Sequence, residues 1–180
     1  MHLEEKTIES HMAYEGRIVK VKSDTVLLED GSQALREVIT HYGGSSVLPL
    51  TDKNEVIMVK QFRYPFSEVL LEIPAGKLNY KGEDPLEAGK RELLEETGAE
   101  ADEIIKIGEL YPIPAYVTEV IHIFLAKGLS FKEQHLDKDE FLDVVKIPFD
   151  KALEMVMTGE IKDAKTQIAI LKAKLLMEKE

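Results

Sequence analysis

Apolar and polar positions along the chain fall into short alternating segments typical of strands. Segments 17–22, 25–29 and 34–42 predict three strands, and Asp30-Gly31 predicts the tight turn before the last of them. Six later strands are expected at 47–50, 55–62, 69–73, 104–110, 119–126 and 141–147. The first group forms an antiparallel unit, and the run Gly43-Gly44-Ser45-Ser46 supplies a flexible joint after it. We therefore expect an N-terminal unit at 1–44 and a main domain at 45–180.

Three segments have the signals of helices. The first begins with Asp84 as N-cap and Pro85 in the first turn, and it ends at Gly98. A second helix is expected at 150–158, ended by Gly159, and a third at 163–177. The third has an apolar stripe formed by Ile168, Leu171, Leu175 and Leu176. Strands mixed with a few helices predict a mixed α/β class, with no internal repeat.

The first helix separates apolar from acidic positions. Its apolar side is expected to hold Leu86, Leu93, Leu94 and Thr97. Glu92, Glu95 and Glu96 lie within one turn on an arc of about 100°. Three carboxylates so close repel one another unless a cation lies among them, and oxygen ligands of this kind suit Mg²⁺ or Mn²⁺. The alternative is a solvated acidic face that the neighbouring Arg91 and Lys90 screen.

The whole segment from Gly76 to Ala99 resembles the signature of the Nudix hydrolases, G-x5-E-x7-R-E-U-x-E-E-x-G-U with U aliphatic. The matching residues are Gly76, Glu83, Arg91, Glu92, Leu93, Glu95, Glu96, Gly98 and Ala99. One departure is that six residues, 77–82, separate Gly76 from Glu83 where the family pattern has five. The extra residue falls in a loop before the capped helix, so the spacing from Glu83 to Gly98 is unchanged.

The resemblance implies a fold and a chemistry. The fold is an α/β/α sandwich with a mixed sheet, preceded here by the small antiparallel unit. The chemistry is hydrolysis of a nucleoside diphosphate linked to another moiety, with metal ions activating the water. The implied metal ligands are Glu92 and Glu96 as the chief pair, Glu95 as a further ligand and the carbonyl of Ala75. The implied structural residues are Gly76, Glu83 paired with Arg91, and Gly98.

Features outside the signature suggest the substrate. Pro114, sixteen residues beyond Gly98, resembles the proline mark of the ADP-ribose pyrophosphatase subfamily. The segments 14–19, 61–65, 71–76 and Asp163-Ala164-Lys165-Thr166 are similar to that subfamily as well. The candidate substrate contacts are Arg36, Arg63, Glu72 and Pro114. Each has a plainer alternative, since a proline also ends strands and an isolated arginine is usually a surface charge.

Two of these contacts have a chemical rationale. The guanidinium of Arg63 can fork onto phosphate oxygens or reach the terminal ribose. Glu72 can accept hydrogen bonds from the adenine amino group or a ribose hydroxyl.

The general base is expected on the acidic loop before the last strand. Our choice is Glu140, with Asp139 and Asp137 behind it, because similar enzymes use a glutamate on a mobile loop at this place. The alternative is a solvated run of charge.

Composition restricts the setting. A formal net charge of −11 argues against bulk attraction to nucleic acid or anionic membrane. The chain has no cysteine, which excludes disulfides, thiolate zinc sites and cysteine nucleophiles and suits the cytoplasm. No apolar run has the length of a signal peptide or membrane span.

Partner and rival functions follow from the resemblance. It implies a homodimer in which N-terminal strands reach the partner's site. The rivals to ADP-ribose hydrolysis are hydrolysis of another ADP-sugar, nucleotide sugar or oxidised nucleotide, and ADP-ribose binding without catalysis.

Overall fold

A computed structural model of the protein describes residues 3–136, 138 and 140–179. The strands are β1 (Lys6–Glu15), β2 (Lys20–Leu27), β3 (Gln33–Thr40), β4 (Gly44–Pro49), β5 (Glu55–Arg63), β6 (Glu68–Glu72), β7 (Ala75–Lys77), β8 (Ala99–Leu110), β9 (Ile121–Phe131) and β10 (Leu142–Pro148). The helices are α1 (Pro85–Thr97), α2 (Phe149–Thr158) and α3 (Ala164–Met177), with a short 3₁₀ turn, η1 (Tyr64–Phe66).

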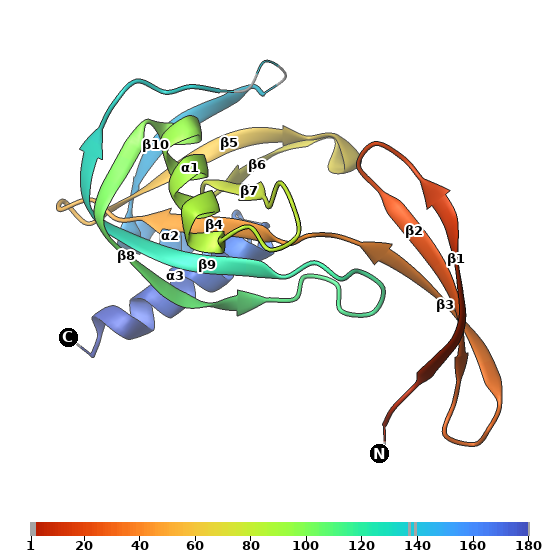
Figure 1. The fold of residues 1–180 in the computed structure, drawn as a ribbon. Helices are drawn as coiled ribbons and strands as arrows, with labels where there is room; N and C mark the ends of the chain where they lie inside the picture. The colour runs from red at the N-terminus through yellow and green to blue at the C-terminus, as the bar shows by residue number, and fades with distance from the viewer. Residues whose placement is uncertain (1–2, 137, 139, 180) are drawn as a thin grey trace.

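Three sheets organise the chain. The N-terminal sheet has the order β1-β2-β3 and projects away from the rest of the molecule (Figure 1). A second sheet has the order β10-β5-β6 and a third the order β7-β4-β9-β8. The third sheet is mixed, because β4 pairs parallel with β9, whereas the pairs β4–β7 and β8–β9 are antiparallel.

Side chains of the central strands point alternately into two separate hydrophobic cores. On β4, β5 and β9, residues Leu48, Met58 and Leu125 pack with α2 and α3. Their immediate neighbours, which include Val47 and Ile57, point to the opposite side and pack with Leu93 of α1. Strand side chains alternate between faces, so buried strands of this kind need a helix layer on each side. The mixed α/β/α sandwich with an antiparallel N-terminal unit is therefore confirmed.

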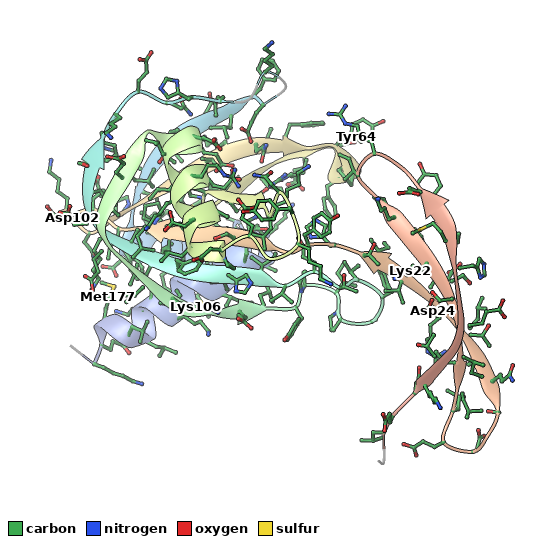
Figure 2. All side chains as sticks on the ribbon, in the orientation of Figure 1. Lys22, Asp24, Tyr64, Asp102, Lys106 and Met177 are labelled. Atoms are coloured by element: carbon green, nitrogen blue, oxygen red, sulfur yellow. The ribbon has the colours of Figure 1, made fainter. Side chains whose placement is uncertain are left out.

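Predictions at the N-terminus were partly wrong. The expected strands at 17–22 and 25–29 are one continuous strand, β2, and the whole of β1 was not predicted. Every residue of β1 is exposed, so the strand lacks the buried side that a core-facing strand would have. Side chains of the projecting sheet extend into open space, among them the labelled Lys22 (Figure 2).

The predicted apolar stripe of α3 was wrong for its three leucines, although Ile168 is partly buried and packs against the core. Leu171, Leu175 and Leu176 are exposed by 38%, 60% and 39%, whereas the buried positions are Lys165, Thr166, Ala169, Ile170 and Ala173. Small alanine side chains let the helix approach the sheet closely, and this packing overrides the larger leucines as a guide to the buried face.

Candidate active site

Helix α1 has the ends that its sequence predicts. Asp84 Oδ1 accepts a hydrogen bond from the backbone N–H of Leu86 at 2.8 Å, which satisfies an otherwise unpaired donor of the first turn. Gly98 ends the helix with φ of 69°, a left-handed conformation that favours glycine. These caps fix the rotation of the helix and with it the directions of its glutamates.

Gly76 lies directly against the carboxylate of Glu92. A Cβ atom added at Gly76 would lie 2.1 Å from Glu92 Cδ, closer than any real contact allows. Strand β7, which contains Gly76, therefore touches α1 here, and a side chain at position 76 would displace the carboxylate of Glu92. In the segment between β7 and α1, Gly82 adopts φ of 90°, and no atom lies within 4 Å of a Cβ placed there.

Glu96 is a buried carboxylate, only 2% exposed. One of its oxygens, Oε2, accepts a hydrogen bond from the N–H of Ala75 at 3.1 Å. Burial, followed by repulsion from Glu140 and Glu92, raises the pKa of Glu96 to about 8. Contrary to the expected separation of faces, α1 thus turns one of its glutamates inward, toward the loop.

Glu92 and Glu140 complete a group of repelling charges. Burial raises the pKa of Glu92 although Arg91 opposes the shift, and the charges of Glu95 and Glu140 add to it. Because the charge of Glu140 raises the pKa of both Glu92 and Glu96, Glu140 lies near these glutamates of α1. Asp137 and Asp139, the other residues named for the general base, lie outside the described residues.

Arg91 contacts three carboxylates from one position. Its guanidinium lies 2.6 Å from Glu92 Oε1, 3.4 Å from Glu95 Oε2 and 3.4 Å from Glu83 Oε1. The side chain of Glu95 is 40% exposed, so this carboxylate lies at the rim rather than in the interior. Arg91 therefore links the loop residue Glu83 to the acidic turn of α1.

A second charged network lies beside the loop, at the ends of β5 and β6. Arg63 Nε and Nη2 donate to the two oxygens of Glu72 at 2.6 and 2.7 Å, a bidentate pair. Lys165 of α3 also donates to Glu72 and, at 3.0 Å, to Asp163. The carboxylate of Glu72 is thus taken up by two cations, and its predicted contact with adenine or ribose stays a prediction.

A cavity of about 210 Å³ connects this network with the loop. Its lining includes Arg63, Lys165, Ala75 and Gly76. Arg63 and Lys165 therefore face the same cavity as Ala75, whose carbonyl is a candidate metal ligand. Sequence reasoning missed Lys165, although the segment Asp163 to Thr166 that contains it was among those noted for resemblance.

Two of the predicted substrate residues lie away from this cavity in a single chain. Arg36 is on the projecting β3 strand, where its guanidinium binds the carboxylate of Glu5 at 2.6 and 2.9 Å. Pro114 is exposed in the turn between β8 and β9. That turn joins β3, since Ile39 N–H donates to Tyr116 O at 2.8 Å. The single chain brings neither residue to the acidic group formed by Glu92, Glu96 and Glu140.

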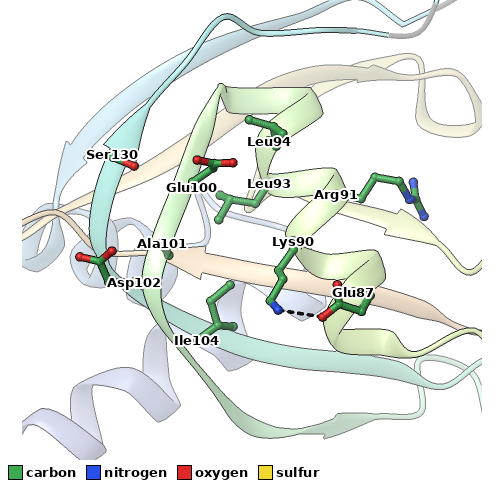
Figure 3. A pocket seen from close by; sticks show the side chains of 10 residues that line it. All are labelled: Glu87, Lys90, Arg91, Leu93, Leu94, Glu100, Ala101, Asp102, Ile104 and Ser130. Atoms are coloured by element: carbon green, nitrogen blue, oxygen red, sulfur yellow. Dashed lines mark hydrogen bonds and ion pairs between the residues drawn. The ribbon is translucent and has the colours of Figure 1, made fainter.

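A larger cavity, of about 450 Å³, lies between α1 and β8 (Figure 3). Its charged residues include Lys90, which pairs with Glu87 at 2.7 Å within the same helix. Arg91 borders this cavity but extends away from its other side chains (Figure 3). The acidic group therefore opens on another side of α1.

The donor set fits a divalent cation in its chemistry. Glu92, Glu96 and Glu140 bring like charges together, and burial with this repulsion raises the pKa of Glu92 despite Arg91 and that of Glu96 despite the N–H of Ala75. Carboxylate and carbonyl oxygens are hard ligands. Among the described residues, however, no three His, Cys, Asp or Glu side chains are already arranged around one point as a metal-binding group. Within that same part of the chain, no helix has the length and apolar character needed to cross a membrane.

Sequence comparisons match both parts of the chain. A family model described as the NUDIX domain matches residues 41–167, and one described as the nucleoside diphosphate sugar hydrolase N-terminal domain matches residues 5–39. The ADP-ribose pyrophosphatase of Bacillus subtilis (strain 168) is 43% identical over 170 residues, which cover 93% of this chain and 91% of that protein. The methanol dehydrogenase activator of Bacillus methanolicus is 42% identical over 169 residues, with the same coverage. The GDP-mannose pyrophosphatase of Escherichia coli (strain K12) is 37% identical over 145 residues, 75% of each chain.

A solved structure shares the fold. The crystal structure of an ADP compounds hydrolase superposes with a TM-score of 0.86 and covers 97% of this chain and 95% of that chain. The sequence identity is 19%, so this likeness concerns the fold alone.

Proposed function

The chain belongs to the Nudix family, and from this premise we propose that it hydrolyses the pyrophosphate bond of ADP-ribose to AMP and ribose 5-phosphate. The observation that carries the proposal is the meeting of two repelling glutamates, the partly buried Glu92 and the buried Glu96, with strand β7 at Ala75 and Gly76. The identity of 43% with an ADP-ribose pyrophosphatase over most of the chain supports the substrate.

Glu92 and Glu96 would hold a divalent cation together with the carbonyl of Ala75, and Glu95 would add a ligand from the rim. Mg²⁺ or Mn²⁺ suits these oxygens. When bound, such an ion lowers the pKa of a coordinated water and neutralises charge that develops on the phosphate. Arg91 holds Glu92 at 2.6 Å and so keeps this carboxylate oriented.

The remaining steps depend on side chains of the protein itself. Glu140, at the edge of the acidic group, accepts the proton of the attacking water as general base. Arg63, in the cavity beside the loop, binds a phosphate oxygen or the terminal ribose of the substrate. Gly76 lets the loop approach Glu92, and the Glu83–Arg91 pair ties that loop to α1.

A homodimer is part of the proposal. The projecting sheet exposes large apolar side chains, including Ile8 (53%), Met12 (46%) and Leu35 (61%). Apolar side chains on both a long exposed strand and its neighbours suit a second protein surface. We propose that a second copy covers them, that residues 1–44 act as the exchanged unit, and that Arg36 and Pro114 contribute to the substrate site of the dimer. We place the enzyme in the cytoplasm because a chain without cysteine suits a reducing compartment.

A second candidate is hydrolysis of another nucleotide sugar, which the relation to GDP-mannose pyrophosphatase supports. Purified protein with Mg²⁺ should be incubated with ADP-ribose, GDP-mannose, another ADP-sugar and an oxidised nucleoside triphosphate, and the products separated by chromatography. We expect AMP and ribose 5-phosphate to form fastest from ADP-ribose. Equal turnover of all substrates would contradict the specific assignment, and tight ADP-ribose binding without any product would indicate a binding module instead.

A further inference from the structure

Lys165 is a charged side chain in an unusually buried position. It lies in the first turn of α3 and is only 8% exposed. Its ammonium donates to the carboxylates of Glu72 and Asp163. A lysine in such a place loses its hydration, and these two carboxylates compensate for that loss.

The Glu72 carboxylate connects Lys165 to Arg63. Glu72 is 2% exposed and receives two bonds from Arg63 at 2.6 and 2.7 Å. Burial alone would raise its pKa, but the bonds from Arg63 and Lys165 hold the pKa below its usual range. Since Glu72 remains ionised, Lys165 balances part of the negative charge of Glu72, which Arg63 would otherwise balance alone.

The two cations face the cavity at the glycine loop. Arg63 and Lys165 both line it, together with Ala75 and Gly76. If Lys165 were absent, the Glu72 carboxylate would lose the contact that fixes it from the side of α3. The bidentate pair with Arg63 would then no longer be held in one orientation toward the cavity.

We propose that Lys165 is a positioning residue: by sharing the Glu72 carboxylate, it holds Arg63 in the orientation that binds a phosphate group of the substrate. The inference rests on the proposed function, because it assigns a cause to the substrate contact of Arg63. Lys165 acts through Glu72 and Arg63 rather than on the reacting atoms.

Attachment of α3 to the sheet does not depend on Lys165. Asp163 caps the helix by accepting from Thr166 N–H at 2.9 Å. Thr166 Oγ1 in turn accepts from the N–H of Ile73 at 2.9 Å, next to the loop. These bonds remain when the ammonium is removed, so a Lys165→Met variant retains a means of docking the helix.

The chain offers a matched control. Lys162 lies three residues before Lys165, and its ammonium also pairs with a glutamate of β6, Glu68, at 2.6 Å. Its side chain is 56% exposed, and it is absent from the cavity lining. Lys162→Met therefore removes the same charge from the same segment without touching the Glu72 network.

The test measures steady-state hydrolysis of ADP-ribose, and equilibrium binding of ADP-ribose by calorimetry in EDTA, for wild type, Lys165→Met, Lys162→Met, Arg63→Ala and Arg63→Ala/Lys165→Met. We expect Lys165→Met to raise KM and the dissociation constant by about tenfold with a smaller change in kcat. Lys162→Met should stay within about twofold of wild type. In the Arg63→Ala background, Lys165→Met should add little, because the residue through which it acts is already gone.

The outcomes separate the two proposals. If wild type is active and Lys165→Met binds and hydrolyses ADP-ribose as wild type does, the inference alone is overturned. The same holds if the fold-losses of Lys165→Met and Arg63→Ala multiply in the double variant. A Lys165→Met variant in which kcat and the thermal midpoint both fall while KM stays unchanged also overturns it, since this result indicates a structural role only. A wild type that neither binds nor cleaves ADP-ribose overturns the proposed function and this inference with it.

Discussion

The N-terminal sheet and the α1–loop region use charge and apolar surface in opposite ways. The sheet β1-β2-β3 leaves Ile8, Met12 and Leu35 in solvent, whereas the α1 region places the carboxylate of Glu96 in the interior. Folding alone accounts for neither arrangement, because burial favours apolar groups and disfavours unpaired charge. We propose that each region is completed from outside the single chain: a second copy would cover the sheet, and a divalent cation would bind at the glutamates.

The strongest way to break this comparison is to remove charge from the α1 region. Glu96→Gln keeps the shape of the side chain but removes a proposed metal ligand, and we expect kcat to fall by about a thousandfold or more. Circular dichroism should show the fold retained, and Glu92→Gln should behave similarly. Glu87→Gln, on an exposed part of the same helix, is the matched control. Undiminished hydrolysis in both site variants would mean that these carboxylates have no catalytic part.

Gly76 tests the contact between the loop and α1. In Gly76→Ala the new methyl group would lie 2.1 Å from Glu92 Cδ, so the carboxylate or the loop must shift. We expect a loss of about a hundredfold in kcat/KM, since small displacements at a site are costly. Gly82→Ala in the same loop changes a glycine with no neighbouring atoms, although its φ of 90° adds local strain. Activity in Gly76→Ala equal to that in Gly82→Ala would show that the contact with Glu92 is unimportant.

The N-terminal sheet is tested by placing charge on its apolar surface. Ile8→Asp/Met12→Asp should convert a dimer into a monomer, seen by light scattering, because two carboxylates would be buried at the interface. We expect kcat/KM to fall by about tenfold as the contributions of the partner are lost. His11→Asp on the same strand is the control, because side chains alternate along a strand and His11 lies on the face opposite Met12. A double variant that remains as associated and as active as wild type would remove the need for a partner.

The pH dependence of stability without metal should show the smallest effect. The folded pKa of Glu96 is about 8 against an ordinary value of 4.5. Below pH 4.5 both folded and unfolded states hold the proton, but at higher pH only the folded state retains it, up to about pH 8. This group therefore stabilises the fold fully at low pH, and its contribution is lost as pH rises toward 8. In EDTA, the thermal midpoint of wild type should fall relative to that of Glu96→Gln by several degrees between pH 5 and pH 8. Parallel plots of midpoint against pH for the two proteins would contradict the raised pKa of Glu96.

The sequence predicted the α1 region well because its signals are local. The cap at Asp84, the stop at Gly98 and the spacing of the glutamates depend on neighbours within a few turns. Strand β1 was missed because it has no buried side whose pattern could identify it. Lys165 was missed as a functional residue because its partner Glu72 lies 93 positions away in the chain. Pairings of this kind become visible only when the tertiary fold brings α3 beside β6.

The most direct measurement is a crystal structure of the Glu140→Gln protein with Mg²⁺ and ADP-ribose, in which slow turnover preserves the substrate. We expect divalent ions between Glu92, Glu96 and the carbonyl of Ala75, in contact with the diphosphate. The guanidinium of Arg63 should border the same ligand. A diphosphate bound elsewhere, with no ion at these glutamates under saturating Mg²⁺, would contradict the central claim.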